Sequence, residues 1–247
     1  MKRFTLFLMA FMASITFVIS QTNYAMYENT YLMVKTDKYK EFGEAMTKHN
    51  EKFHSGGGPY HANVWLVTTG EYVGSFVWSM GPNTFTHLDS RPDSKEHTED
   101  WIYNVMPNVH KIRETGYWKR ADKISFTAED SVTSKLRITV YDLKDWQSYR
   151  FKEIVSKVAE VYKENNYEHS FQAYFPAFRM PNNREAAIVW GFNNYAVFDE
   201  DYKFKEDFET LHGEGSWTKV MDEYKDIVNE AVDEIWEIIP DMSGKRE

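Results

Sequence analysis

The amino-acid sequence predicts an α+β protein in which two tandem β-α-β-β-α-β repeats form one pseudo-symmetric α/β barrel. The first observation behind this prediction is a pattern that occurs twice, about 110 residues apart. Val77-Trp78-Ser79 corresponds to Val189-Trp190-Gly191, residues 84–89 correspond to 194–199, and Trp118 corresponds to Trp236. The second observation is that both halves carry strand and helix signals in the same order. A period of this length fits a small domain and is too long for a solenoid unit.

The first repeat is assigned to residues 21–126. Its first helix follows Asp37 and is recognised by apolar residues every three to four positions, until Gly56-Gly57-Gly58-Pro59 ends it. The next two strands are separated only by Thr69-Gly70, which is hairpin spacing. We expect the second helix to be interrupted or kinked near Pro107. The expected elements are strand 29–35, a helix through Tyr39, Phe42, Met46 and Phe53, strands 60–68 and 71–80, helix 98–112 and strand 116–120.

The second repeat is assigned to residues 135–242, after a polar linker at 127–134 and before a polar tail at 243–247. The helix in its first half places Phe151, Ile154, Val155 and Val158 on one side, which is typical of a helix packed against a sheet. The expected elements are strand 135–141, helix 148–164, strands 168–175 and 185–192, a long helix at 217–235 and a closing strand at Ile238-Ile239.

This order of elements is the ferredoxin-like arrangement. Two such units in one chain resemble the dimeric α/β-barrel superfamily, and the resemblance covers residues 28–241. The superfamily includes antibiotic-biosynthesis-type monooxygenases, EthD-like and NIPSNAP-like proteins, and haem-binding relatives of chlorite dismutase. The resemblance implies two sheets placed face to face with helices outside, and it implies little about function, since many activities share this fold.

Residues 1–20 are typical of a cleaved export signal. Lys2 and Arg3 precede an apolar run from 4 to 18, and cleavage is expected ahead of Gln21. The run of roughly 15 residues is shorter than the ~20 that span a bilayer, which favours cleavage over a membrane anchor. We therefore expect a periplasmic or secreted protein with no membrane contact after cleavage.

Charge and cysteine content exclude several classes of function. After removal of residues 1–20, 27 basic residues stand against 38 acidic ones, a net charge of −11 that disfavours nucleic acid and anionic lipid as partners. The sequence contains no cysteine, so disulfides, thiolate ligands and cysteine nucleophiles are absent. Oligomeric state is not determined by any pattern in the sequence.

Strand alternation suggests a ligand-binding wall. In the second strand His61, Asn63 and Trp65 share one face, and in the corresponding strand of the second repeat Ser170, Gln172 and Tyr174 do so. In the first strands Tyr31 is grouped in the same way with Arg137 and Tyr141. Such faces favour a small-molecule pocket between the sheets, with a dry aromatic interface as the alternative. The residues of this hypothesis are Tyr31, His61, Asn63, Trp65, Trp78, Arg137, Tyr141, Gln172, Tyr174 and Trp190.

No motif identifies a metal, a cofactor or a catalytic residue. The eight histidines show no zinc-binding spacing, although His54 and His61 flank the glycine run and could converge. A haem iron would need an axial histidine, for which His97 or His110 is the candidate. The acidic residues from Asp199 onward lack the calcium-loop pattern and are interpreted as a solvated loop. We therefore predict no cofactor and no metal site.

Three functions remain open. The first is binding of a small organic ligand between the two sheets. The second is a cofactor-independent monooxygenase or isomerase, in which His61, Arg137 or Tyr141 would polarise a carbonyl and Asn63 and Gln172 would orient it. The third is a non-catalytic interaction protein, since exposed aromatic residues also mark interfaces.

Overall fold

The structure is a computed structural model that describes residues 24–92, 94–129 and 132–246. The expected export signal, residues 1–20, lies outside the described residues. The helices and strands in chain order are β1 (Met26–Val34), α1 (Tyr39–Phe53), β2 (Ala62–Val67), β3 (Phe76–Asn83), α2 (Phe85–Asp89), α3 (Lys95–Asp100), β4 (Val109–Arg120), β5 (Lys135–Leu143), α4 (Ser148–Glu164), β6 (Phe171–Pro176), β7 (Ala186–Phe192), α5 (Phe204–His212), α6 (Ser216–Ile227) and β8 (Val228–Ile238).

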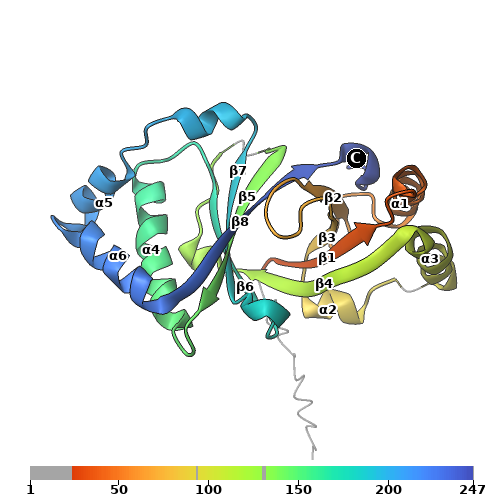
Figure 1. The fold of residues 1–247 in the computed structure, drawn as a ribbon, viewed down its shortest axis with the longest axis horizontal. Helices are drawn as coiled ribbons and strands as arrows, with labels where there is room; N and C mark the ends of the chain where they lie inside the picture. The colour runs from red at the N-terminus through yellow and green to blue at the C-terminus, as the bar shows by residue number, and fades with distance from the viewer. Residues whose placement is uncertain (1–23, 93, 130–131, 247) are drawn as a thin grey trace, which may run out of the picture.

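The eight strands of the described chain form a closed antiparallel barrel (Figure 1). Around the barrel the order is β1-β3-β2-β8-β5-β7-β6-β4, and β4 pairs with β1 to close it. The first half of the chain supplies β4-β1-β3-β2 and the second half supplies β8-β5-β7-β6. Two short antiparallel pairings, β2 with β8 and β4 with β6, join the halves. The predicted α+β class and barrel are confirmed.

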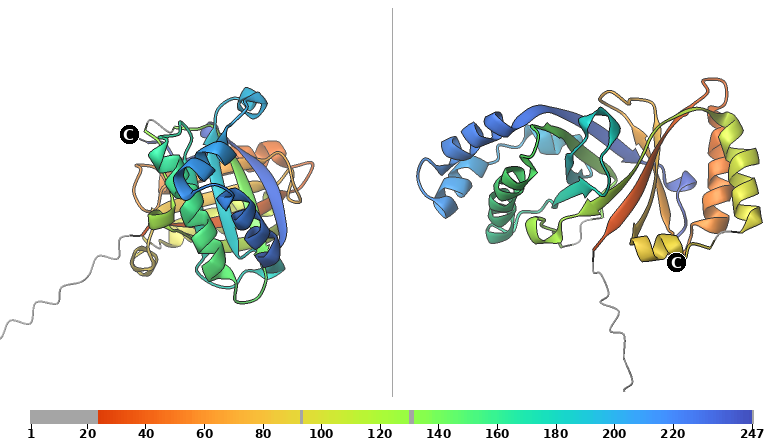
Figure 2. Two further views of the ribbon diagram at one scale, coloured as in Figure 1. Left: turned by 90° about the vertical axis from the view of Figure 1, so that its left-hand side faces the viewer. Right: turned by 90° about the horizontal axis from the view of Figure 1, so that it is seen from below.

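Helices cover the outside of the barrel at its two ends, as the right-hand view of Figure 2 shows. α1 and α3 cover the sheet of the first half, and α4, α5 and α6 cover that of the second. Apolar residues on α1 and α4 recur at helical spacing, so each helix buries one face, for example Phe42 and Met46 on α1. No helix of the described residues has the length and apolar character needed to cross a membrane.

The core is divided into layers by the barrel wall. One cluster lies between β-strands and α4–α6, a second fills much of the barrel interior, and a third lies under α1 and α3. The interior cluster contains aromatic residues from both halves, among them Tyr31, Trp118, Tyr174 and Trp236. A strand of this barrel is therefore covered on both faces, and hydrophobic alternation alone does not reveal which face points inward.

Several sequence-based assignments differ from the structure. The expected hairpin turn at Thr69-Gly70 is longer, because β2 ends at Val67 and β3 begins at Phe76. The expected helix 98–112 is α3, a π-helical turn (Trp101–Val105) and a 3₁₀ turn (Met106–Asn108), after which β4 begins at Val109. The expected helix 217–235 ends at Ile227, and residues 228–235 belong to β8. The β-branched residues Val228, Val232 and Ile235 favour a strand here.

The acidic stretch interpreted as a loop is partly helical. Residues 200–203 are irregular, and α5 follows from Phe204 to His212. Phe208 anchors α5, because its side chain is fully buried against Trp217, with ring centroids 5.4 Å apart. Glu206 and Asp207 in the first turn of α5 favour the helix through its dipole.

The C-terminal segment, expected to be a polar tail, is bound to the first half beside α1 (Figure 1). The backbone N–H of Gly244 donates to the carbonyl of Ala62 at 2.8 Å, and that of Gly56 donates to Lys245 at 2.8 Å. The hydroxyl of Ser243 accepts from the N–H of Val64 at 2.9 Å. These contacts give the segment a fixed position over the loop between α1 and β2.

We expect Gly244→Ala to lower the free energy of unfolding by about 1–3 kcal/mol, the usual range for overpacking. A Cβ at this position would lie 1.9 Å from the backbone oxygen of His54, which belongs to a helix end and moves little. Chemical denaturation measures the change. Gly58→Ala is the matched control, because a Cβ there meets nothing within 4 Å. Equal stability of the two variants would show that the C-terminal segment is not packed in this way.

Candidate ligand-binding sites

The ten residues predicted to line one pocket are divided by the structure among different places. Five of them face a cavity inside the barrel, and we call this the inner cavity. Three lie on the outside of the second-half sheet, in a separate cleft. Inside are Tyr31, Asn63, Trp65, Gln172 and Tyr174, and outside are Arg137, Tyr141 and Trp190. Their role as ligand contacts stays a prediction.

The other two predicted residues lie apart from both cavities. Trp78 is buried under α1, where its indole N–H donates to Asn50 Oδ1 at 3.0 Å. His61 immediately precedes β2 and is 3% exposed; its Nε2 lies 3.3 Å from Asn63 Oδ1. Burial lowers the pKa of His61. The side chain of His54 points to His49 and His97 and not to His61.

The division has a simple cause in the register of the sheet. Tyr31 pairs with Val77, and Ile138 pairs with Val189, so Ile138 occupies in β5 the inward place that Tyr31 occupies in β1. Grouping Tyr31 with Arg137 is therefore wrong by one residue. A shift of one residue moves every side chain of a strand to the opposite face. Arg137 and Tyr141 consequently point toward the helices.

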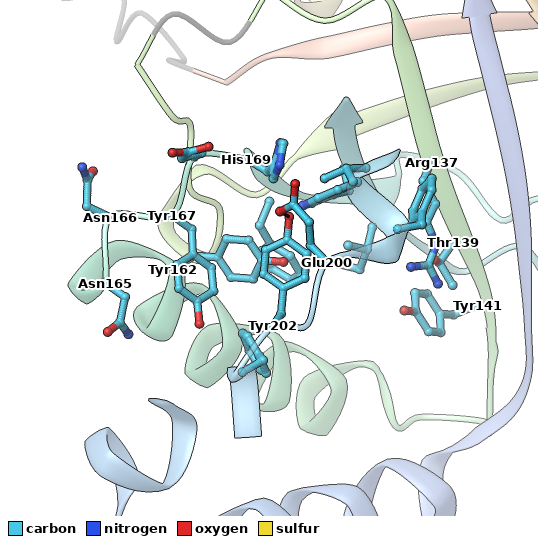
Figure 3. A pocket seen from close by; sticks show the side chains of 17 residues that line it. Arg137, Thr139, Tyr141, Tyr162, Asn165, Asn166, Tyr167, His169, Glu200 and Tyr202 are labelled. Carbon is cyan, nitrogen blue, oxygen red and sulfur yellow. Dashed lines mark hydrogen bonds between the residues drawn. The ribbon is translucent and has the colours of Figure 1, made fainter. Parts of the chain in front are cut away.

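Arg137, Tyr141 and Trp190 line a cleft of about 710 Å³ between the second-half sheet, α4 and the segment before α5; we call it the outer cleft. Figure 3 shows Arg137, Thr139 and Tyr141 along one side, and Tyr162, Tyr167 and the two asparagines on the other. Its residues are Arg137, Thr139, Tyr141, Tyr162, Asn165, Asn166, Tyr167, Glu168, His169, Phe171, Ile188, Trp190, Val197, Phe198, Glu200, Tyr202 and Phe204. Aromatic rings thus make up much of its wall.

Cross-strand pairing sets the floor of the outer cleft. Trp190 of β7 pairs with Arg137 of β5 on one side and with Phe171 of β6 on the other. The ring of His169 lies against Trp190, with centroids 4.4 Å apart. The cation of Arg137 and the imidazole of His169 therefore lie next to the apolar side chains of Trp190 and Phe171.

Fixed hydrogen bonds order the polar groups of the outer cleft. Arg137 donates to Asp233 at 2.8 Å, and the hydroxyl of Thr139 donates to the same carboxylate at 2.5 Å. The hydroxyl of Tyr202 donates to Glu200 at 3.0 Å. Burial raises the pKa of Tyr162 to about 12, and burial together with the bond to Glu200 raises that of Tyr202 to about 12. Both phenols are therefore neutral at physiological pH.

The inner cavity has a volume of about 320 Å³ and is mostly apolar, with Leu136, Val140 and Val189 on its second-half wall. Its polar end is a buried network that the sequence analysis missed. Arg184 is 8% exposed and donates to Glu234 at 3.0 Å and to the hydroxyl of Tyr31 at 2.9 Å. The indole N–H of Trp236 donates to the same Glu234 carboxylate at 2.8 Å. The inner cavity therefore combines a hydrophobic wall with a rigid charged end.

The network contains two carboxylates for one guanidinium. Glu114 is 4% exposed, lies 3.5 Å from Arg184 Nε, and has no hydrogen-bond partner on either oxygen within the described chain. Burial raises the pKa of Glu114, although Arg184 opposes the shift. Burial alone lowers the pKa of Arg184, but Tyr31, Glu234 and Glu114 together raise it above its ordinary value. Arg184 thus stays charged and balances the carboxylates.

A signal for this network was present in the sequence. Glu114 is the one acidic residue of β4, and Glu234 is one of four acidic residues in β8. Each lies at an even spacing from a tryptophan that faces inward, Trp118 for Glu114 and Trp236 for Glu234. Strand alternation then places both carboxylates inside the barrel. Arg184 lies in a loop, where alternation gives no direction.

Neither candidate axial ligand for haem lies in the outer cleft or the inner cavity. His97 belongs to α3 in the first half, next to His49 and His54, and His110 is an exposed residue of β4. Among the described residues that line the outer cleft, His169 is the only histidine. Neither His97 nor His110 is therefore placed to ligate an iron in these two cavities.

Comparison with known proteins identifies the fold. No protein-family model matches the sequence, and no curated protein matches it. Among solved structures, a proposed monooxygenase from Lactobacillus acidophilus is similar with a TM-score of 0.53 and 11% identity, covering 90% of this chain and 97% of that one. Chlorite dismutase from Candidatus Nitrospira defluvii is similar with a TM-score of 0.52 and 5% identity, covering 90% of this chain and 94% of that one. A heme-binding protein from Thermus thermophilus is similar with a TM-score of 0.50 and 7% identity, covering 88% of this chain and 92% of that one.

These similarities show the fold alone, because all three identities are far below the level at which function transfers. The chain has the dimeric α+β barrel fold that the sequence analysis expected.

Proposed function

We propose that the protein binds a flat, mostly apolar organic molecule, neutral or cationic, in the outer cleft. The observation that carries the proposal is the concentration of aromatic side chains around a hollow of about 710 Å³. Ligand pockets are typically mostly apolar hollows of about 300–1,000 Å³ with a few placed polar groups. Phe198 and Tyr202 at the rim are 45% and 44% exposed. Large aromatic residues exposed together at a cleft mark a binding surface.

The charges of the outer cleft favour a neutral or cationic ligand. Among its described residues Arg137 is the only lysine or arginine, and Asp233 already balances it. Glu168 and Glu200 are both exposed residues of the lining. Neutral phenols and an indole beside carboxylates attract cations through the faces of their rings. A ligand with a carboxylate would be repelled by Glu168 and Glu200, and no unpaired lysine or arginine of the described lining would offset this repulsion.

Haem, which one of the similar structures binds, does not fit the donor set of the outer cleft. An axial histidine is usually held through its second nitrogen by a carboxylate or carbonyl, as metal-ligating imidazoles are. No side chain or carbonyl of the described chain hydrogen-bonds His169, whose ring lies against Trp190. The described lining also offers no unpaired lysine or arginine for the two propionates of haem, since Arg137 is paired with Asp233, and it carries Glu168 and Glu200. We therefore assign no haem chemistry to this cleft.

The enzymatic alternative lacks an assembled site. Its predicted groups are separated, since Arg137 and Tyr141 line the outer cleft, Asn63 and Gln172 line the inner cavity, and His61 lies before β2. Burial raises the pKa of Tyr141, so its phenol is a neutral hydrogen-bond donor and not a base. Binding is the function that this geometry supports best.

Binding of 9-aminoacridine, a flat cation, tests the proposal. We expect saturable binding with one site per chain, measured by fluorescence titration. Trp190→Ala and Tyr202→Ala each remove an aromatic surface and should weaken binding by about tenfold, or about 1.4 kcal/mol. Anthracene-9-carboxylate, a flat anion, should bind more weakly than 9-aminoacridine.

Trp65→Ala is the matched control, because Trp65 lines the inner cavity and should leave the affinity unchanged. If Trp65→Ala weakens binding and Trp190→Ala does not, the ligand occupies the inner cavity and the proposal is wrong. A Soret band on addition of haem that is lost in His169→Ala would overturn the haem argument.

We also propose that the two halves are tandem ferredoxin-like repeats and that the exported protein begins at Gln21. Each half has the order strand, helix, strand, strand, helix region, strand. Trp78 and Trp190 both face outward toward helices, and Trp118 and Trp236 both face the barrel interior. N-terminal sequencing of protein from the periplasm or medium tests the cleavage.

A further inference from the structure

Three histidines that are far apart in the sequence converge in the first half; we call them the histidine cluster (His49, His54 and His97). His49 lies in α1, His54 follows its last residue, and His97 lies in α3. One ring nitrogen from each lies within 4.8 Å of the other two. The ring centroids of the three pairs are 5.0 to 5.2 Å apart. The two helices thus bring three imidazoles to one point.

The outer nitrogens of two rings are held in place. His49 Nδ1 lies 2.7 Å from Asp100 Oδ2, and His54 Nδ1 lies 2.7 Å from the carbonyl oxygen of Tyr60. Because a carboxylate and a carbonyl accept hydrogen bonds, each Nδ1 carries the proton and each Nε2 carries a lone pair. Metal-binding histidines typically show this arrangement, with the second nitrogen fixed by a carboxylate or a backbone carbonyl.

The inner nitrogens are positioned as ligands would be. His54 Nε2 lies 3.2 Å from His97 Nε2. Two nitrogens at about 2.0–2.1 Å from one tetrahedral zinc lie about 3.3–3.4 Å apart. His49 is 1% exposed, and its Nε2 has no hydrogen-bond partner in the described chain. A buried ring nitrogen without a partner costs free energy, and a metal ion would satisfy it.

We propose that the histidine cluster binds a divalent transition-metal ion through three imidazole nitrogens, with Zn²⁺ as the reference ion. Imidazole suits zinc, copper and nickel better than magnesium or calcium. Three protein ligands leave one position of a tetrahedral ion open, as in zinc sites that bind water or substrate. His97 is only half-buried, so the ion can enter along α3.

The surrounding charges are compatible with a cation. The positive charge of Arg91 acts on both His49 and His54. Its guanidinium lies over the ring of Trp78 at 5.9 Å and pairs with Glu28 at 3.4 Å. Lys52 is paired with Glu96. The carboxylate of Asp100 adds a negative charge directly behind His49 and is expected to strengthen binding as a positioning group.

Isothermal titration of the untagged, metal-free full chain with Zn²⁺ tests the proposal. We expect one ion per chain. His97→Gln should weaken binding at least tenfold, and Asp100→Asn should weaken it by about 10- to 100-fold, as loss of an outer-shell partner does. His110→Gln is the matched control, because this exposed histidine of β4 lies outside the cluster and should leave affinity unchanged.

Two further readouts keep the test independent of folding defects. Co²⁺ bound in place of Zn²⁺ should give the visible absorption of a tetrahedral site in the wild type and lose it in His97→Gln. Zn²⁺ should raise the melting temperature of the wild type but not that of His97→Gln, since an ion that binds only the folded state stabilises it. Failure of the wild type to bind Zn²⁺, or equal affinity in wild type and His97→Gln, would overturn the proposal.

Discussion

Arg184→Met is expected to lower the free energy of unfolding by about 3–5 kcal/mol, the cost of removing one partner from a buried ionic network. The guanidinium is 8% exposed and is the cation of a network that holds Glu114 and Glu234, both less than 5% exposed. Without it, two buried carboxylates face each other uncompensated. Denaturation in urea, with free energies extrapolated to water, measures the loss.

The dependence of this loss on pH identifies its cause. The pKa of Glu114 is already raised by burial in the wild type, and removal of Arg184 takes away the group that opposes the shift. A carboxyl with a raised folded-state pKa binds its proton more tightly when folded, so stability falls as pH rises through that pKa. The difference in free energy of unfolding between wild type and Arg184→Met should therefore shrink as the pH is lowered into the range in which the buried carboxyls are protonated.

Arg137→Met is the matched control for Arg184→Met. Its ion pair with Asp233 has nearly the same length, but both side chains are more than 40% exposed. Solvent screens such a pair, and the expected change is about 0–1 kcal/mol. In a second variant, Arg184, Glu114 and Glu234 are all replaced by methionine. This variant should recover most of the stability lost in Arg184→Met. Equal losses for Arg184→Met and Arg137→Met would mean that the network is not buried in solution.

Phe208→Ala is also expected to lower the free energy of unfolding by about 3–5 kcal/mol, because a fully buried aromatic ring is replaced by a cavity. The ring contacts Trp217 of α6 and His212 of α5, with centroid distances of 5.4 and 4.5 Å. It therefore fixes α5 against α6. Calorimetry or urea denaturation checks the value.

Leu211→Ala provides the comparison on the same helix. Leu211 is 41% exposed, and its truncation should change stability by no more than about 0.5 kcal/mol. Because α5 starts at Phe204, which lines the outer cleft, Phe208→Ala should also weaken binding of 9-aminoacridine. A loss below 1 kcal/mol in Phe208→Ala would show that the acidic stretch is a solvated loop, as the sequence suggested.

Local patterns were sufficient for much of the fold. The helix expected at 148–164 is α4 with the same bounds, and the strand expected at 185–192 is β7 within one residue. Both depend on interactions between near neighbours, which the sequence displays directly. The helix expected to continue to residue 235 ends at Ile227, because pairing of β8 with β5 and β2 outweighs the local helical preference.

The candidate sites were predicted less well than the elements that carry them. Tyr31, Asn63 and Gln172 were placed correctly inside the barrel, whereas Arg137 and Trp190 were assigned to the wrong face. Both faces of β5 and β7 are covered, one by the opposite wall of the barrel and the other by helices or the outer cleft. Alternation separates the two faces of such a strand without saying which one is inside.

The sequence by itself determined the α+β class, the order of elements and the absence of cysteine chemistry, since these follow from composition and short-range periodicity. Only the tertiary structure decided which side chains meet. Arg184 joins Glu114 and Glu234, and His97 joins His49 and His54, through contacts between residues more than 40 positions apart. Such contacts are set by strand register and by the packing of helices on the barrel. Neither can be deduced from a short segment of the sequence, because both depend on residues far apart in the chain.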